Sequence, residues 1–175
     1  MNNLYKLRRK LFPIYRNLKA VEMLKRKNNG KKLICVEIGC SKGVNAKRML
    51  NYLNIGKLYL IDIKKYNNFE NWEYVKFLEM DGIEAADKIP DGLDYVFYDL
   101  LVDYDSDYGK HINNYDNMYI YLDKWIPKLK VGGMMSGRYF TPRCLNDVCA
   151  IIDYVKYRTD LKLYGVSNEW WIIKE

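Results

Sequence analysis

The segment from Val36 to Gly43 is the part of the sequence whose residue types best suit contact with a ligand. Its two glycines, Gly39 and Gly43, lack a Cβ, so the backbone can bend sharply and a ligand can approach it closely. The helix predicted to follow would offer free N–H groups in its first turn. A surface loop that needs two positive φ angles would carry the same glycines, so this alternative stays open.

Asp62 supplies a carboxylate at the end of the second apolar run, roughly 20 residues beyond Gly39, the separation at which such an acid binds a ribose. A carboxylate there can accept hydrogen bonds from both ribose hydroxyls. The GxGxxG pattern that binds a pyrophosphate is absent, which favours a nucleoside without phosphates over a dinucleotide. The alternative is that Asp62 caps the turn that follows it.

Alternating strands and helices are expected to position these residues. Apolar runs at 33–38 and 58–63 are typical of strands buried on both faces. Further strands are expected at 74–78, 95–98 and 134–139, helices at 45–53, 83–88, 114–129 and 145–158, and a turn at 131–133. Strands separated by helices imply parallel crossovers, whereas the short link between 161–166 and 170–173 predicts an antiparallel hairpin.

Charge is unevenly distributed along the chain. Residues 1–32 contain 11 lysines or arginines and one acid, Glu22, while the whole chain has a net charge of only +7. Apolar residues recur at helical spacing over 4–27, and Pro13 interrupts them, so we expect two short helices, the second ending at 28–30. A basic arm of this kind favours contact with an anionic partner, either nucleic acid or a lipid surface. The alternative is a solvated helix face.

The bulk composition indicates one domain in a reducing compartment. A length of 175 residues and a hydrophobic content of 49% suffice for one packed core. Cys35, Cys40, Cys144 and Cys149 form no CxxC pair, and no secretory segment is evident, so we expect a cytoplasmic protein. No apolar run is long enough to span a membrane. The oligomeric state is not predicted.

Several motifs, taken in order, resemble those of class I S-adenosylmethionine-dependent methyltransferases. They are Glu37-Ile38-Gly39 with Gly43, Asp62, Asp81-Gly82, Asp94, Asp99 and Leu129-Lys130-Val131-Gly132-Gly133. The resemblance implies an α/β fold with a Rossmann-like, seven-stranded, mostly parallel sheet, an antiparallel last strand and helices on both faces. It divides the chain into a basic N-terminal helical extension, 1–30, and an S-adenosylmethionine-binding methyltransferase domain, 31–175.

The resemblance also implies a set of cofactor-binding residues. It places Glu37, Gly39 and Gly43 around the methionine part of S-adenosylmethionine, and it adds Cys40, Ser41 and Asp99 to the cofactor-binding residues. Asp62, followed by Ile63, would bind the ribose. Asp81 would bind the adenine amine, with Met80 or Gly82 beside the purine.

Three residues are candidates for the chemistry that the resemblance implies. Methyl transfer requires alignment of donor and acceptor and, for a hydroxyl, removal of a proton. Asp99, after strand four, is the first candidate, although it could instead cap a helix or pair with Arg138. His111 is the only histidine and could act as a base near neutral pH, or simply be solvated in its polar loop. Arg138, after strand five, could orient an anionic group.

The acceptor class is the least constrained feature. The sequence is similar to small-molecule and sugar O-methyltransferases, so a hydroxyl of a small molecule or glycan is the first expectation. It lacks their histidine after strand four and their acids after strand five, which argues against a bound metal. Ribose 2′-O-methyltransferases of RNA use a Lys-Asp-Lys-Glu tetrad, and Asp99, Arg138 and Glu169 fall at three of its places, with Lys6 or Lys10 available for the first. An arginine cannot serve as a base, however.

A third possibility is a nucleoside-binding or RNA-binding module that has kept the fold without the chemistry. The missing histidine and the missing acids after strand five suggest it.

Overall fold

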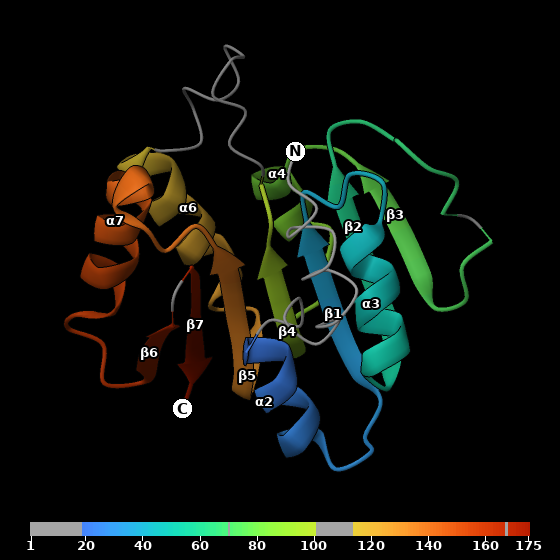
Figure 1. Ribbon diagram of the computed structural model, residues 1–175, viewed down its shortest axis with the longest axis horizontal. Coiled ribbons are helices and arrows are strands. Elements are labelled where there is room, and N and C mark those ends of the chain that lie inside the picture. Colours follow the sequence, from blue (N-terminus) through green and yellow to red (C-terminus); the bar gives the residue numbers. More distant parts are fainter. Residues whose placement is uncertain (1–18, 70, 101–113, 167) are drawn as a thin grey trace, which may run out of the picture.

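The computed structural model describes residues 19–69, 71–100, 114–166 and 168–175 (Figure 1). The strands are β1 Leu33–Ile38, β2 Ile55–Asp62, β3 Val75–Glu79, β4 Leu93–Tyr98, β5 Leu129–Arg138, β6 Leu161–Val166 and β7 Glu169–Lys174. The helices are α2 Lys19–Asn28, α3 Val44–Tyr52, α4 Gly82–Ala86, α6 Tyr115–Trp125 and α7 Leu145–Val155, with a 3-10 turn at Pro142–Cys144. His111, Lys6, Lys10 and the first predicted helix lie outside the described residues.

All seven strands form one sheet in the order β3-β2-β1-β4-β5-β7-β6. Neighbouring strands from β3 to β5 are parallel, while β7 runs antiparallel to both β5 and β6. The predicted sheet with its reversed last strand is therefore confirmed. After β3 the chain returns to the other side of β1, so the carboxyl ends of β1 and β4 meet at the switch point where open α/β sheets bind ligands.

Helices cover both faces of the sheet, as predicted. On one face, α2 and α3 bury Val21, Leu24 and Met49 against the strands, and Figure 1 shows these two helices in front of the sheet. On the other face, α4, α6 and α7 pack against a second cluster that includes Leu122 and Ile151. Because both faces are covered, a strand such as β1 is apolar at every position except Glu37 instead of alternating.

Two predicted boundaries were wrong. The turn expected at 131–133 lies inside β5, where the pairing with β4 slips: Leu93 is opposite Leu129, but Tyr95 is opposite Met134. Gly132, at φ 78°, provides the positive φ of this bulge. The helix expected at 114–129 ends at Trp125 as α6, and Asn114 caps its start by accepting from two backbone N–H groups.

Helix α2 ends at Asn28, where Asn29 and Gly30 take positive φ, as the sequence predicted. It packs on the sheet, and the backbone N–H of Lys19 donates to Glu169 Oε2 at 2.7 Å. The division of the chain at residue 30 stays a prediction. Within the described ranges, no helix combines the length and the apolar character needed to cross a membrane.

Gly137 of β5 is expected to be difficult to replace. A Cβ at this position would lie 2.7 Å from the ring of Trp170, which is 1% exposed and has no room to move. We expect Gly137→Ala to lower the free energy of unfolding by about 2 kcal/mol, measured by urea denaturation. Gly132→Ala is the control, because no atom lies within 4 Å of its Cβ position and only the positive φ opposes it. Equal losses in both variants would show that crowding by Trp170 is not the cause.

Candidate functional site

The bend between β1 and α3 is held close to the ends of both neighbouring strands. The N–H groups of Gly39 and Cys40 both donate to the carbonyl of Ile61, at 2.8 and 3.2 Å. Gly39 has φ 82°, and a Cβ there would lie 2.7 Å from the backbone oxygen of Asp99. The positive φ fits either interpretation of the glycines, but the contact with Asp99 requires a glycine for a second reason, the close approach of β4.

The second glycine of the bend is covered by aromatic rings. Gly43 has φ 74°, and a Cβ would lie 2.6 Å from Phe69 Cε1 and 2.9 Å from Trp72 Cη2. The two rings meet edge to face, with centroids 5.1 Å apart. Gly43 also begins α3 without a side-chain cap. The start of this helix therefore lies beneath an aromatic cover that the sequence did not predict.

Glu37 is the buried acid of the site. Glu37 is the penultimate residue of β1, and its side chain is 1% exposed. Its Oε1 accepts a hydrogen bond from Asn45 Nδ2 at 3.2 Å. Its Oε2 is buried and has no hydrogen-bond partner among the residues that the structure describes. Burial, followed by the negative charge of Asp99, raises the pKa of Glu37 to about 8. The Asn45 hydrogen bond opposes this shift only in part.

Asp99 lies beside it at the end of β4. Arg138 Nη1 is 3.5 Å from Asp99 Oδ2, while Asp99 Oδ1 is buried without a hydrogen-bond partner in the described part of the chain. Burial raises the pKa of Asp99 to about 6, against the lowering charges of Arg138 and Arg48. The guanidinium of Arg138 lies 5.6 Å from the centroid of the Phe97 ring, which fixes its plane. The predicted alternative, a pairing of Asp99 with Arg138, is therefore present.

Asp62 connects the bend to the second strand. Its Oδ2 accepts from the N–H of Ser41 at 2.7 Å, and its Oδ1 accepts from the N–H of Lys64 at 3.3 Å. The second bond caps the turn after β2, which was the alternative to ribose binding in the sequence analysis. Each oxygen still keeps a further lone pair for a ligand hydroxyl. The next residue, Ile63, is 49% exposed, so an apolar side chain stands unburied beside the carboxylate.

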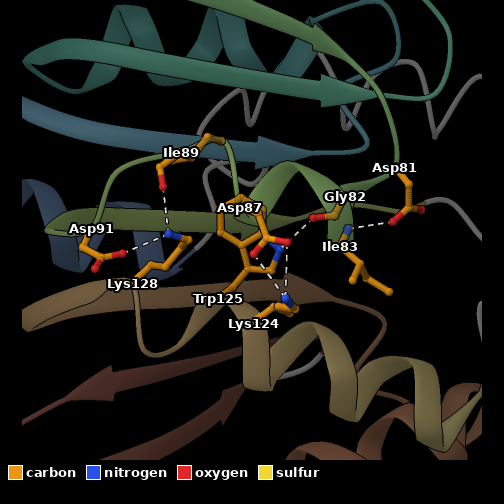
Figure 2. A network of polar contacts seen from close by, with 9 residues as sticks. All are labelled: Asp81, Gly82, Ile83, Asp87, Ile89, Asp91, Lys124, Trp125 and Lys128. Atoms are coloured by element: carbon orange, nitrogen blue, oxygen red, sulfur yellow. Dashed lines mark hydrogen bonds and ion pairs between the residues drawn. The ribbon is translucent and has the colours of Figure 1, made fainter.

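The residues proposed to surround a purine lie at the end of β3. The N–H of Met80 donates to the carbonyl of Asp62 at 3.0 Å, which joins the ends of β2 and β3. Asp81 caps α4 by accepting from Ile83 N at 2.7 Å. The carbonyl of Gly82 accepts from Trp125 Nε1 at 3.1 Å, and Figure 2 shows this bond beside the capping bond of Asp81. These two hydrogen bonds hold the turn between β3 and α4 in place.

The structure thus brings together most of the residues predicted from the sequence to bind the cofactor or to take part in catalysis. They lie at the carboxyl ends of adjacent strands: Glu37, Gly39, Cys40, Ser41, Gly43, Asp62, Ile63, Met80, Asp81, Gly82, Asp99 and Arg138. The charges of Asp99 and Asp62 both act on the pKa of Glu37, which places three acids within electrostatic reach of one another. His111 is outside the described residues. The roles of all these residues stay predictions.

Sequence reasoning missed four contributors. Asn45 and Arg48 lie in the first turns of α3, and Phe69 and Trp72 lie between β2 and β3. Asn45 follows Gly43 by two positions, so its place in the first turn of the predicted helix was a usable signal. The two aromatic residues gave none, because their contact with Gly43 arises only from the path of the β2–β3 connection.

Comparisons with known proteins agree on the fold. A proposed methyltransferase from Streptococcus mutans in complex with S-adenosylhomocysteine is 15% identical, with TM-score 0.69, over 89% of this chain and 96% of that chain. An rRNA methylase from Streptococcus thermophilus is 15% identical, with TM-score 0.62, over 89% and 93%. The N-methyltransferase NodS from Bradyrhizobium japonicum is 16% identical, with TM-score 0.59, over 93% and 98%.

No protein-family profile matches the chain, and neither does any curated protein sequence. The solved structures nevertheless establish that the chain has the fold of class I S-adenosylmethionine-dependent methyltransferases.

Glu37 is expected to destabilise the ligand-free protein as the pH rises. Its pKa is raised from 4.5 to about 8, so folding favours the protonated carboxyl, and ionisation above pH 4.5 reduces stability progressively until about pH 8. We expect Glu37→Gln to raise the free energy of unfolding by on the order of 3 kcal/mol at pH 7, and by little near pH 4.5. Thermal unfolding of the variant and the wild type between pH 4.5 and pH 7 measures this difference in stability. A gain in stability that did not depend on pH would refute the raised pKa of Glu37 as its cause. The control is Glu84→Gln, which changes an exposed acid.

Proposed function

We propose that this chain is an S-adenosylmethionine-dependent methyltransferase that acts on a hydroxyl group. One observation carries the proposal: Glu37 Oε2 and Asp99 Oδ1 are both buried, and neither has a hydrogen-bond partner among the described residues. Two carboxyl groups in this state favour a cation between the bend and the end of β4. S-adenosylmethionine carries two positive groups, an ammonium and a sulfonium, at the end that would lie there.

The rest of the site fits the remaining parts of the same molecule. The bend would receive the methionine part along the backbone of Cys40 and Ser41, because Gly39 packs against β4 and Gly43 lies beneath aromatic rings. Asp62, whose oxygens keep free lone pairs, would accept from the ribose hydroxyls. The purine would lie between exposed Ile63 and the turn of Met80, Asp81 and Gly82. These placements follow the fold and the order of the strand ends.

The bound cofactor would supply a methyl group on a positively charged sulfur. The chain's own residues would then align the acceptor oxygen and remove its proton. Asp99 would accept the hydroxyl proton as the acceptor oxygen takes the methyl group, so that an oxygen–carbon bond would replace the carbon–sulfur bond and S-adenosylhomocysteine would be the second product. Burial raises the pKa of Asp99 to about 6, so at neutral pH it is largely ionised and able to accept that proton. His111 stays a second candidate base.

A small-molecule or glycan hydroxyl remains the first acceptor in this proposal. Arg138 is partly exposed at the strand ends, so it could pair with an anionic group of a compact acceptor while holding Asp99 in place. We also propose the cytoplasm as its compartment, in keeping with the free thiols of Cys35, Cys40, Cys144 and Cys149.

RNA ribose is the second candidate acceptor, and a specific arrangement favours it. Asp99 and Arg138 are 3.5 Å apart, and Arg138 pairs in register with Glu169 across β5 and β7. Three of the four tetrad positions of RNA 2′-O-methyltransferases are therefore neighbours. Arg138 would stabilise charge there and would not act as a base.

Replacing Glu37 is expected to weaken cofactor binding, although the same change should stabilise the free protein. We expect Glu37→Gln, which should stabilise the free protein, to weaken S-adenosylhomocysteine binding by about 2 kcal/mol, because a charged hydrogen bond to the ammonium is lost. Asp62→Ala should weaken it by a similar amount, about 2 kcal/mol, by leaving two ribose hydroxyls unpaired. Isothermal calorimetry measures both, with Glu84→Gln as the control. An absence of wild-type binding at millimolar ligand would contradict the proposal.

Methyl transfer is expected to depend on Asp99. Asp99→Asn keeps the size of the side chain but cannot accept the proton, so kcat should fall by about a hundredfold or more. The wild-type rate should decline as the pH drops through about 6, and the variant should lose this dependence. The assay is transfer of labelled methyl groups to fractionated cell extract, with and without ribonuclease. Retained wild-type activity in the variant would exclude Asp99 as the base, and no transfer to any fraction would favour the non-catalytic module.

A further inference from the structure

Beyond residue 18, positive charge is concentrated in the segment 19–76. Residues 19–76 contain 13 lysines and arginines and 5 acids, whereas residues 77–175 contain 11 and 17. Of those 5 acids, Glu37 is buried and Asp62 is half-buried, so the excess of positive charge at the surface is larger still. The basic region therefore reaches well beyond the N-terminal arm that the sequence indicated.

Several lysines of residues 19–76 lie over aromatic rings. The pairs, with the distance from the lysine nitrogen to the ring centroid, are Lys25–Tyr52 at 3.9 Å, Lys32–Tyr74 at 5.5 Å, Lys47–Trp72 at 5.1 Å and Lys64–Tyr66 at 5.4 Å. We call these eight residues the basic aromatic face. The first pair joins α2 to α3, the two helices in front of the sheet in Figure 1. The other pairs lie around β1, β2 and β3, toward the β3 edge of the sheet.

Two of the three tyrosines of the face are available to a partner, whereas Tyr52 packs against the core. Tyr66 is 49% exposed and Tyr74 is 43% exposed. Tyr74 also has φ 66°, a conformation that is unfavourable for a residue with a Cβ and that burial of the ring does not offset. An exposed ring held in a strained conformation suits contact with a ligand better than packing.

We propose that the basic aromatic face binds single-stranded RNA. A face that carries both lysines and aromatic rings suits the phosphates and bases of an unpaired strand: the lysines would neutralise phosphates, and the exposed rings would stack on bases. Base stacking of this kind requires unpaired bases, as in RNA loops and ends. An anionic membrane would match the charge of the lysines as well, but it offers no bases for the exposed rings to stack on, and the apolar residues of α2, Val21 and Leu24, are buried against the sheet.

The face adjoins the cofactor site. Trp72 covers Gly43, and the backbone of Lys64 donates to Asp62, so a strand lying along the face would reach the carboxyl ends of β1 and β2. RNA binding itself does not require methyl transfer, and the inference rests on the proposed function only where it makes RNA the acceptor. The two can therefore fail separately.

The test is fluorescence anisotropy of a labelled, mixed-sequence, 20-nucleotide RNA with the full chain, without cofactor, over a range of salt concentrations. The triple variant Lys25→Gln, Lys32→Gln, Lys47→Gln should lose about 2 from the slope of log affinity against log salt, since each lysine contributes about 0.7 for a single strand. Its affinity at 0.1 M salt should fall on the order of a hundredfold. The matched control is Lys88→Gln, Lys156→Gln, Lys162→Gln, which removes the same charge and includes a lysine over an aromatic ring, Tyr157.

Stacking is tested separately at Tyr74. Tyr74→Leu should weaken RNA binding about fivefold or more without changing the salt slope, and Tyr74→Phe should retain the affinity. Equal loss in both triple variants, or equal affinity of Tyr74→Leu and wild type, would overturn the proposal. So would tighter binding to phosphatidylserine vesicles than to RNA, or a preference for single-stranded DNA. Calorimetry of S-adenosylhomocysteine with the same variants identifies a failure of the cofactor site, which would leave the RNA result standing.

Discussion

The site depends on two adjacent acids whose charge is only partly compensated by the residues that the structure describes. Glu37 ends β1, Asp99 follows β4, and the sheet order makes these strands neighbours, so the two carboxyl groups are forced together at the switch point. Arg138 and Asn45 each satisfy one oxygen and leave the other buried without a partner among the described residues. A purely structural site would gain by replacing one acid with an amide. The arrangement is intelligible as a cation site whose ligand completes the charge balance.

The other features of the site follow from holding that pair in place. Gly39 permits β4 to approach the bend, and Gly43 permits the aromatic cover over the start of α3. The N–H of Ser41 ties the bend to Asp62, and the N–H of Met80 ties Asp62 to β3. The first of these two hydrogen bonds joins a backbone N–H to the Asp62 carboxylate and the second joins two backbone groups, so the sheet and one side chain together set the positions of the strand ends.

The sequence predicted the sheet well because the fold is driven by patterns it displays directly. Apolar runs, helical spacing and a three-residue link identified all seven strands and the reversed hairpin. The errors arose where tertiary contacts override local signals. The glycines at 132 and 133 read as a turn, but pairing with β4 makes them a bulge inside β5. The partners of Gly43 were invisible because Phe69 and Trp72 have no spacing relation to it.

Trp72 gives the protein an internal optical reporter. Its indole is half-buried against Phe69, and its edge lies 2.9 Å from the Cβ position of Gly43, on the bend that receives the methionine part in our proposal. Indole emission shifts with the polarity and hydration of its surroundings, and Trp125, Trp170 and Trp171 are buried elsewhere in the core, where they give a constant background. Occupancy of the bend can thus be followed by the protein's own fluorescence, without a dye or a radioactive substrate.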